Sequence, residues 1–274
     1  MAFSLTFIIK EDLCRSSIVL KYKSKFRIFR SYLNLSCSSS SHNTSNRRSL
    51  TTSVYLLKDK VSSNIWLERQ RRDIFVKQAG AENYRCRSAF KLKQINEKFS
   101  ILCPGHIVID CGSAPGSWCQ VAVQEVNATG EDINKPKGTV IGVDLQYFSP
   151  VDGATILPQS DFTTEATQTK IKDLLCHQKA DVLLSDMAPR ATGLRSHNHE
   201  AIIELCFYVL RFSLVILKPE GTMLCKLWMG GDQSRFEKAM QTVFQHVRVV
   251  KPEASREDSA EIFLLGRKFT GIKN

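Results

Sequence analysis

Three aspartates stand where predicted strands end, and carboxylates at such positions can bind a nucleotide-type ligand. Asp144 closes one short apolar run, and Asp161 and Asp186 follow two others. In a doubly wound sheet, ligands bind beyond the carboxyl ends of the strands, where an acid can accept hydrogen bonds from ribose hydroxyls. Each aspartate alone could be a turn-forming or capping residue. Three at equivalent positions favour one shared site.

A lysine inside a predicted strand is the second feature with chemical potential. Lys226 lies between Cys225 and Leu227 in an otherwise apolar stretch. A buried ammonium is costly unless it is paired or lies near a strand end. Glu261, which opens the last predicted strand, is a candidate partner. Structure alone explains this lysine poorly, so we treat it as a candidate functional residue.

The stretch VIDCGSAPGSW (108–118) would contribute the first strand, turn and helix start of a nucleotide-type ligand site. It predicts a strand that stops at Asp110, a turn through Gly112 and a helix that starts near Trp118. A strand, a glycine turn and a helix start form the first unit of a nucleotide-binding sheet. Gly112 permits a tight turn because it has no side chain. The stretch lacks the G-x-G-x-x-G pattern, so an ordinary strand-to-helix turn is the alternative.

The elements that must position these residues alternate along the chain. The predicted strands are Ile107–Asp110, Thr139–Asp144, Ala154–Leu157, Ala180–Ser185, Thr222–Leu227, Val247–Val250 and Glu261–Leu265. The predicted helices between them are Trp118–Asn127, Glu165–Leu175, His199–Leu217 and Ser234–Gln245. Strands separated by helices pair in parallel and carry helices on both faces. The fold class is therefore α/β, with a mostly parallel, doubly wound sheet.

Residues 64–100, upstream of the first strand, look helical. A second helix is expected after Ser88, a plausible N-cap. Its buried stripe would consist of residues at helical spacing: Ala89, Leu92, Ile95 and Phe99. Lys91 lies off this stripe, and periodicity alone assigns it to a solvated face.

Composition is that of a globular protein with a proper core. The nine cysteines of the 274 residues include no C-x-x-C pair and no zinc-type cluster, which favours packed thiols in a reducing compartment. No apolar run has the length needed to span a bilayer. The sequence therefore predicts no metal site and no membrane span.

The N-terminal segment 1–50 is unlike a folded domain. It holds nine Lys and Arg against two acids, so +7 of the formal net charge of +11 lies there. This composition, with its serine run, is typical of a mitochondrial transit peptide. The acids Glu11 and Asp12 are atypical of such peptides. A disordered basic arm that touches RNA is the alternative, and the folded domain is expected over residues 64–274.

Several stretches together resemble the FtsJ family of S-adenosylmethionine-dependent ribose 2'-O-methyltransferases. They are YRCRSAFKLKQINEKF (84–99), VIDCGSAPGSWCQVAVQ (108–124), GVDL (142–145), DVLLSDMAPRATG (181–193), GTMLCKLWMGG (221–231) and VVKPEASREDSAEIFLLG (249–266). They occur in family order and cover nearly all of residues 80–268. The resemblance implies a Rossmann-like methyltransferase sheet whose last strand runs antiparallel.

The resemblance also implies the site residues. The catalytic set of the family falls on Lys91, Asp186, Lys226 and Glu261, which overrides the solvated-face interpretation of Lys91. The residues implied to bind S-adenosylmethionine are Gly112, Pro115, Gly116, Ser117, Trp118, Asp144, Asp161, Phe162 and Asp186. The chain departs from the family at Arg190, where an asparagine is usual, and this arginine could add a phosphate contact.

The chemistry of 2'-O-methylation suits these residue types. The donor carries its own leaving group, so the protein must align the 2'-oxygen with the methyl carbon and manage one proton. A general base contributes on the order of 10²–10⁴-fold. We expect Lys226 to be that base, with Asp186 orienting it and with Lys91 and Glu261 orienting the ribose hydroxyl. Burial and Lys91 would lower the pKa of Lys226 while the carboxylates would raise it, so the sequence leaves its protonation state open.

Within the family, the likeness is greatest to the ribosomal branch and its mitochondrial members. This implies methylation of a uridine ribose in the peptidyl-transferase region of mitochondrial large-subunit rRNA, in the matrix, by an enzyme expected to be monomeric. The alternatives are a tRNA 2'-O-methyltransferase and a ribosome-assembly factor with dispensable catalysis. Basic residues before Lys91 could track RNA phosphates or could form a solvated helix face. These residues are Arg69, Arg71, Arg72, Lys77, Arg85 and Arg87.

Overall fold

The structure, a computed structural model, describes residues 67–189, 195–230 and 232–271. The expected N-terminal segment 1–50 and Arg190 lie outside the described residues. Within the described ranges, no helix is long and apolar enough to cross a membrane. No group of three His, Cys, Asp or Glu in the same ranges could hold a metal ion.

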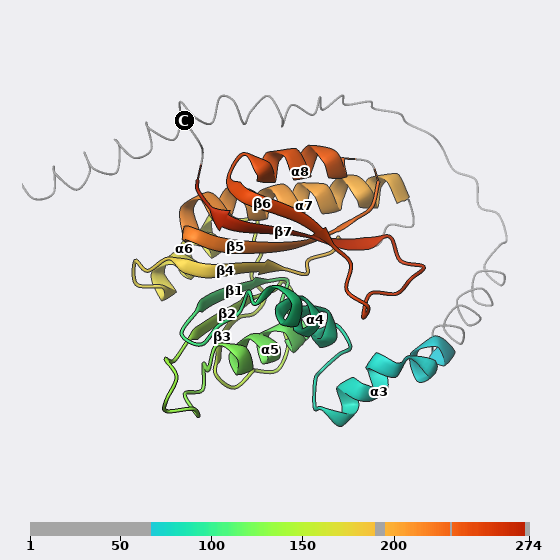
Figure 1. The fold of residues 1–274 in the computed structure, drawn as a ribbon, viewed down its shortest axis with the longest axis horizontal. Coiled ribbons are helices and arrows are strands. Elements are labelled where there is room, and N and C mark those ends of the chain that lie inside the picture. The colour runs from blue at the N-terminus through green and yellow to red at the C-terminus, as the bar shows by residue number, and fades with distance from the viewer. Residues whose placement is uncertain (1–66, 190–194, 231, 272–274) are drawn as a thin grey trace, which may run out of the picture. The chain divides into compact units, whose positions relative to one another are not determined.

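A seven-stranded sheet with the order β3-β2-β1-β4-β5-β7-β6 forms the centre of the fold (Figure 1). Its strands are β1 (Ile107–Cys111), β2 (Thr139–Val143), β3 (Ala154–Leu157), β4 (Ala180–Ser185), β5 (Leu217–Trp228), β6 (Phe244–Val250) and β7 (Glu261–Phe269). The pairs among β1 to β5 are parallel, whereas β7 runs antiparallel to both β5 and β6. This arrangement confirms the expected sheet with an antiparallel last strand.

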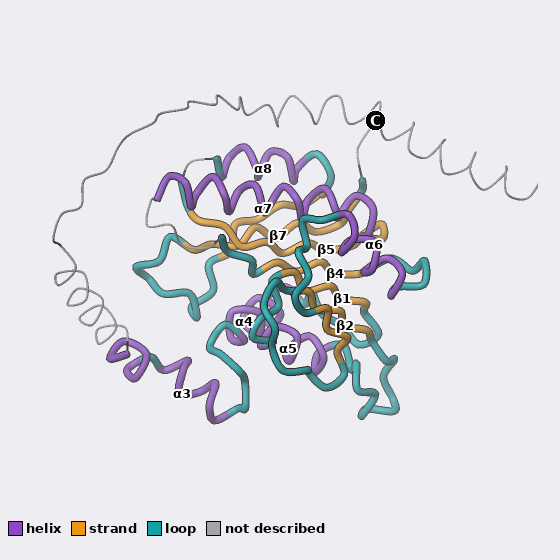
Figure 2. Tube along the Cα trace, turned by 180° about the vertical axis from the view of Figure 1, so that it is seen from behind, coloured by secondary structure: helices purple, strands orange, loops and turns teal. Residues whose placement is uncertain are grey.

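Helices cover both faces of the sheet (Figures 1 and 2). The helices are α3 (Ile74–Ala81), α4 (Ala89–Phe99), α5 (Ser117–Glu125), α6 (Glu165–Leu174), α7 (Arg195–Ile216) and α8 (Gln233–Gln241). Helices α4 and α5 pack together on one face, and α7 and α8 contact each other and the strands on the other. The central strands are therefore buried on both sides, which explains their continuous apolar runs.

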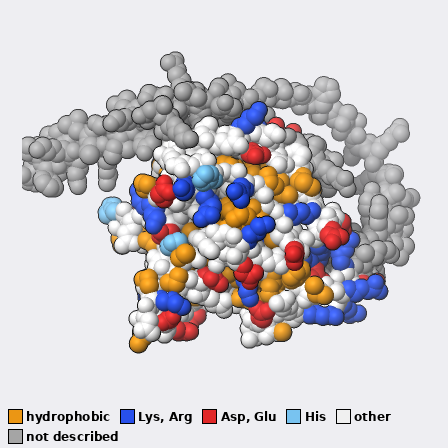
Figure 3. Space-filling view, in the orientation of Figure 1, with side chains coloured by type: hydrophobic (Ala, Val, Ile, Leu, Met, Phe, Trp, Pro, Cys, Tyr) orange, Lys and Arg blue, Asp and Glu red, His pale blue; other side chains and the backbone are white. Residues whose placement is uncertain are grey.

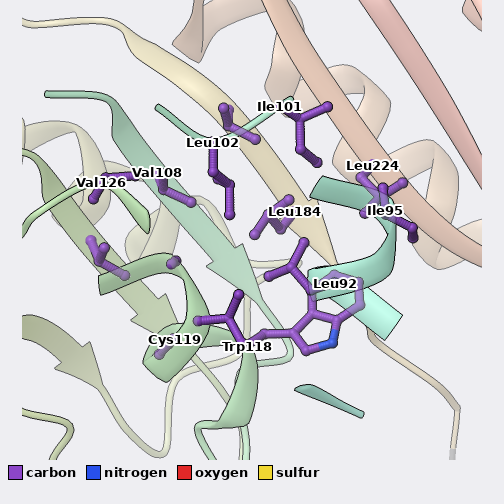
Figure 4. Close-up of a cluster of buried hydrophobic side chains, with 14 of the residues drawn as sticks. Leu92, Ile95, Ile101, Leu102, Val108, Trp118, Cys119, Val126, Leu184 and Leu224 are labelled. Carbon is purple, nitrogen blue, oxygen red and sulfur yellow. The ribbon is translucent and has the colours of Figure 1, made fainter. Parts of the chain in front are cut away.

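The main core cluster lies between the sheet and the α4–α5 pair. Leu92 and Ile95 of α4 meet Trp118 of α5 and Leu184 of β4 in this cluster, as Figure 4 shows. Each of these four side chains is at most 2% exposed. The periodic apolar stripe of α4 is thus confirmed as its buried face, and it fixes this helix against the sheet.

Several predicted boundaries differ from the structure. Helix α7 begins at Arg195 and not at His199, and β7 extends to Phe269 and not only to Leu265. The expected helix Ser234–Gln245 ends at Gln241, because Phe244 begins strand β6 and packs against Phe269 of β7, with ring centroids 5.4 Å apart. Strand β5 begins at Leu217, five residues before the expected start at Thr222. Ser88 occupies the N-cap position of α4 as predicted, although its side chain makes no capping hydrogen bond.

Candidate active site

A cavity of about 270 Å³ opens at the carboxyl ends of β1, β2 and β4. Five of the residues expected to bind the cofactor line it: Gly112, Asp144, Asp161, Phe162 and Asp186. Gly112 has a φ of +81°, and a Cβ there would lie 2.5 Å from the Met187 side chain. A glycine is therefore required at this turn by backbone conformation and by space. The strand ends meet as the sequence predicted.

Two of the aspartates in the cavity are oriented by backbone groups. Asp144 accepts hydrogen bonds from the amides of Ala114 (2.9 Å) and Gln146 (2.7 Å), so it links the turn after β1 to the turn after β2. Asp161 accepts from both the amide and the hydroxyl of Thr163. Bonds of this kind hold each carboxylate in one direction while leaving it further acceptor capacity.

Four expected cofactor residues do not line this cavity. The Pro115 carbonyl accepts a hydrogen bond from Arg85, and Gly116 takes the N-cap position of α5 with a φ of 107°. The Ser117 hydroxyl lies 2.7 Å from that of Ser88. The indole of Trp118 is buried against α4 and β7. Cofactor contacts by these four residues remain predictions, and any contact by Trp118 would have to come from its backbone.

Lys226 and Asp186 form the first of two lysine–carboxylate pairs beside the cavity. The Lys226 ammonium lies 2.7 Å from Asp186 Oδ1 and also donates a hydrogen bond to the backbone carbonyl of Asp186. An ammonium has three N–H donors, so it can contact the carbonyl and the carboxylate at the same time. The side chains are 10% and 17% exposed. The pairing explains how a lysine is tolerated near the end of a buried strand.

Lys91 and Glu261 form the second pair. The Lys91 ammonium lies 2.6 Å from Glu261 Oε1 and 2.8 Å from Oε2, so it engages both carboxylate oxygens. The Ser255 hydroxyl donates a further hydrogen bond of 2.8 Å to Oε1. The structure therefore brings Lys91 and Glu261 into direct contact, and it contradicts the solvated-face interpretation of Lys91.

The antiparallel course of β7 unites the two pairs. Because β7 runs against β5, its first residues lie at the same edge of the sheet as the last residues of β5. Glu261 is paired with Trp228, and Phe263 with Lys226, in the β5–β7 register. The expected set of Lys91, Asp186, Lys226 and Glu261 thus converges from α4, β7 and the ends of β4 and β5.

The charges of this set are stabilised by one another. Burial would lower the pKa of the Lys226 ammonium, but Asp186 and Glu261 outweigh it, so the pKa lies above its ordinary value. Burial would raise the pKa of Glu261, but Lys91, Ser255 and Lys226 outweigh it, so the pKa lies below its ordinary value. Both groups are therefore charged at neutral pH without substrate. Burial does lower the pKa of Lys226 as expected, but the two carboxylates raise it by more.

The sequence pattern of the FtsJ-like methyltransferases matches residues 84–269, which include every residue of the two pairs and of the cavity lining. The chain belongs to the FtsJ-like methyltransferase family. It is therefore an enzyme, a methyltransferase, and the family resemblance of its motifs is confirmed.

Relatives in the family are similar over most of their length. The chain is 47% identical to "rRNA methyltransferase 2, mitochondrial" of Drosophila melanogaster, over 77% of this chain and 84% of that protein. It is 44% identical to "Ribosomal RNA large subunit methyltransferase E" of Cereibacter sphaeroides, over 77% of this chain and 86% of that protein. A solved structure from Plasmodium falciparum, named as a ribosomal RNA methyltransferase, superposes with a TM-score of 0.60 at 27% identity and covers 69% of this chain and all of that one.

Arg85 has a role at this FtsJ-like site that the sequence did not reveal. Its guanidinium donates to the carbonyls of Pro115 (2.8 Å), Ser149 (2.6 Å) and Pro150 (2.5 Å). It also lies over the ring of Phe148, 5.9 Å from the centroid. The arginine thereby connects the turn after β1 to the loop between β2 and β3. No local sequence pattern indicates that the partners of Arg85 are main-chain carbonyls.

The other basic residues before Lys91 divide into two kinds. Arg87 is paired with Asp73 and donates to the Ala254 carbonyl, so it has an internal structural role. In contrast, Arg69, Arg71, Arg72 and Lys77 are exposed. Figure 3 shows Lys and Arg side chains gathered over the part of the surface formed by α3 and the residues before it. These four exposed side chains remain candidates for contacts with RNA phosphates.

Proposed function

We propose that this chain transfers the methyl group of S-adenosylmethionine to the 2'-hydroxyl of a uridine in the peptidyl-transferase region of mitochondrial large-subunit rRNA. The observation that carries the proposal is the convergence of two lysine–carboxylate pairs beside a cavity at the strand ends. The names of the relatives support ribosomal RNA as the substrate and the mitochondrion as the location.

The cavity fits S-adenosylmethionine in its chemistry. Asp144 and Asp161 offer acceptors for ribose and adenine donors, and Phe162 offers an apolar ring. Gly112 lets Met187 pack directly against the turn after β1, because a Cβ at position 112 would collide with Met187. When bound, the donor supplies an activated methyl group on a sulfonium centre. Acidic residues around a cationic ligand also favour its binding electrostatically.

The lysine–carboxylate pairs then have separate tasks. Lys91 and Glu261, joined through two contacts of 2.8 Å or less, would fix the ribose hydroxyl in line with the methyl carbon. Lys226 would accept the hydroxyl proton, and Asp186 would orient its side chain. Because the Lys226 ammonium is stabilised without ligands, it must first release a proton. A sulfonium cation bound nearby would favour that release by like-charge repulsion.

Labelled methyl transfer tests the proposal directly. Mitochondrial large-subunit particles that lack the modification would be incubated with labelled S-adenosylmethionine and either the wild-type chain or Lys226→Met. We expect one labelled uridine, mapped as a 2'-O-methyl group, in the wild-type reaction alone. Calorimetry of donor binding by Lys226→Met provides the control that the variant remains folded and loaded.

Two other outcomes would redirect the assignment. Transfer to tRNA but not to ribosomal particles or naked rRNA would favour the tRNA-modifying function. No transfer to any RNA, together with restored ribosome assembly by Lys226→Met in cells lacking the protein, would favour an assembly factor.

A further inference from the structure

The Trp118 indole contacts the start of α4 and strand β7. Its side chain is buried, and its Nε1 donates a hydrogen bond of 2.9 Å to the carbonyl of Ser88. The same carbonyl accepts the backbone amide of Lys91 at 3.1 Å. The indole therefore holds the peptide group to which the first turn of α4, with Lys91 in it, is bonded.

The other side of the indole meets β7. Its ring lies 5.7 Å from that of Phe263, between centroids, at an interplanar angle of 33°. Phe263 is fully buried, and the Lys91 ammonium lies 6.0 Å from its ring centroid. Phe263 also stands opposite Lys226 in the β5–β7 register. Since side chains alternate along a strand, Phe263 and Glu261 project from the same face of β7.

Helix α4, which carries Lys91, and strand β7, which carries Glu261, thus both depend on contacts with the Trp118 side chain. We propose that the Trp118 indole is a positioning residue that sets the geometry of the Lys91–Glu261 pair from the first turn of the helix beside the donor cavity. The inference rests on the proposed function for its kinetic test. It assigns the side chain of Trp118 to the acceptor half of the site, whereas the family resemblance implied a cofactor contact.

The contacts of Trp118 allow positioning of Lys91 to be distinguished from simple filling of the core. If the indole only filled the core, loss of its N–H would be nearly neutral, because the Ser88 carbonyl keeps the Lys91 amide as a donor. If the indole positions Lys91, the same loss frees the first turn of α4 to shift. A displacement of about 1 Å between reacting groups can reduce a rate by roughly a hundredfold.

The test compares Trp118→Phe with site-specific replacement of Trp118 by benzothienylalanine, which keeps the indole shape and lacks the donor. Single-turnover methyl transfer would be measured at saturating RNA across pH, with donor Kd from calorimetry. We expect both variants to transfer methyl roughly 10- to 100-fold more slowly, with donor Kd changed less than about threefold. Unchanged rates in the benzothienylalanine protein would overturn the inference, as would a rate decrease explained entirely by donor Kd.

A matched control is Phe244→Leu. Phe244 belongs to another buried aromatic pair, with Phe269, on the β6–β7 side of the sheet. Phe244→Leu should lower thermal stability about as much as Trp118→Phe does. It should leave the methyl-transfer rate unchanged at a temperature where the protein is folded. If Phe244→Leu slowed transfer as much as Trp118→Phe does, the effect would be general destabilisation and the inference would fail.

A readout without turnover keeps the inference separate from the proposed function. The carboxyl ¹³C signal of Glu261, assigned by its absence in Glu261→Gln, would be titrated in the wild-type chain and in the Trp118 variants. A loosened Lys91–Glu261 pair raises the pKa of Glu261 toward its ordinary value. That shift would support the inference even if no RNA were methylated. An unmoved Glu261 titration in both variants would refute it.

Discussion

At the scale of single residues, the two lysine–carboxylate pairs differ in how they are held. Glu261 binds Lys91 through both oxygens and has Ser255 as a second donor, whereas Asp186 meets Lys226 through one oxygen and its own backbone carbonyl. The Lys91–Glu261 pair is thus suited to fixed orientation. The Lys226–Asp186 pair has neither this two-oxygen contact between the side chains nor a hydroxyl as a further donor.

The pH dependence of catalysis follows from the charge of Lys226. Its pKa lies above the ordinary lysine value, and the proposed base is the neutral amine, so methyl transfer should accelerate as pH rises through neutrality. Lys226→Met should reduce the single-turnover rate by about 10²–10⁴-fold and abolish that rise. A variant with the wild-type pH profile and rate would exclude Lys226 as the base.

A buried acid at the end of β1 should make folding stability depend on pH. Asp110 is fully buried; it accepts from the Cys119 thiol at 3.3 Å, and its Oδ1 has no partner among the described residues. Burial raises its pKa from 3.8 to about 7. Between these values the folded state binds a proton that the unfolded state has released. This group's contribution to stability is therefore present below pH 3.8 and lost as pH rises to about 7.

Asp110→Asn should remove this dependence because the amide stays neutral. Above pH 7 we expect the variant to be more stable than the wild type, by at most roughly 4 kcal/mol, and near pH 4 the two should match. Urea unfolding at several pH values measures the difference. Parallel stability curves for the two proteins would show that Asp110 does not titrate in this range.

The sequence did not predict the directions in which individual side chains point. The types and positions of the four catalytic candidates were predictable from strand ends and motifs, and the structure brings them together. The contacts of the Trp118 and Ser117 side chains were not predictable. A motif gives the position of a residue in the chain but not the direction in which its side chain points. The carbonyl partners of Arg85 were hidden for a related reason, since main-chain acceptors leave no trace in residue types.

At the scale of elements, strand prediction succeeded where burial on both faces left long apolar runs. Strand β4 has the predicted bounds, and all six of its residues are buried. The edge strand β3, which is less buried, also has the predicted bounds and is followed by Pro158. The boundary between α8 and β6 was wrong because Phe236, Met240 and Phe244 fit helical spacing. Only the long-range packing of Phe244 on Phe269 decides between helix and strand, and such packing is invisible in local periodicity.

The two loops that flank the proposed donor cavity should depend on Arg85 for their positions. Arg85→Met removes three carbonyl hydrogen bonds between the turn after β1 and the β2–β3 loop. Because the guanidinium is exposed, we expect a moderate effect: donor Kd rising roughly 3- to 30-fold, which corresponds to about 1–2 kcal/mol. Calorimetry with S-adenosylmethionine measures it.

Lys93→Met is the matched control, since Lys93 is a nearby cation on α4 that pairs with Glu82 at 2.8 Å and touches neither loop. Its donor Kd should stay at the wild-type value. If Arg85→Met instead left donor binding intact and weakened only RNA binding, Arg85 would be a phosphate contact after all.

At the scale of the whole molecule, charge is distributed unevenly over the described surface. Arg69, Arg71 and Arg72 lie together before α3, and the cavity described above is acidic. Two of these arginines have exposed acidic neighbours: Arg69 lies 3.4 Å from Asp258, and Arg72 contacts Glu68. Exposed pairs of this kind are weak, so a phosphate could replace either carboxylate.

Replacement of Arg69, Arg71 and Arg72 by Gln tests this surface. If the three arginines bind phosphates, the slope of log Kd against log salt for rRNA binding should become shallower by roughly 0.7 for each phosphate that is no longer neutralised. Lys135, Lys137 and Lys172, replaced together by Gln, serve as a control with the same change in charge. Equal slopes for both triple variants would assign the arginines to a solvated face.

The antiparallel strand β7 also has a consequence for the order in which the molecule becomes competent. In the sheet β7 lies between β5 and β6, although it follows both in the chain. Strand β6 pairs only with β7 among the described strands, and Glu261 is the first residue of β7. Every residue that lines the proposed donor cavity is therefore synthesised before Glu261, the last of the four candidate catalytic residues. The Lys91–Glu261 contact can therefore form only after the last strand has been synthesised.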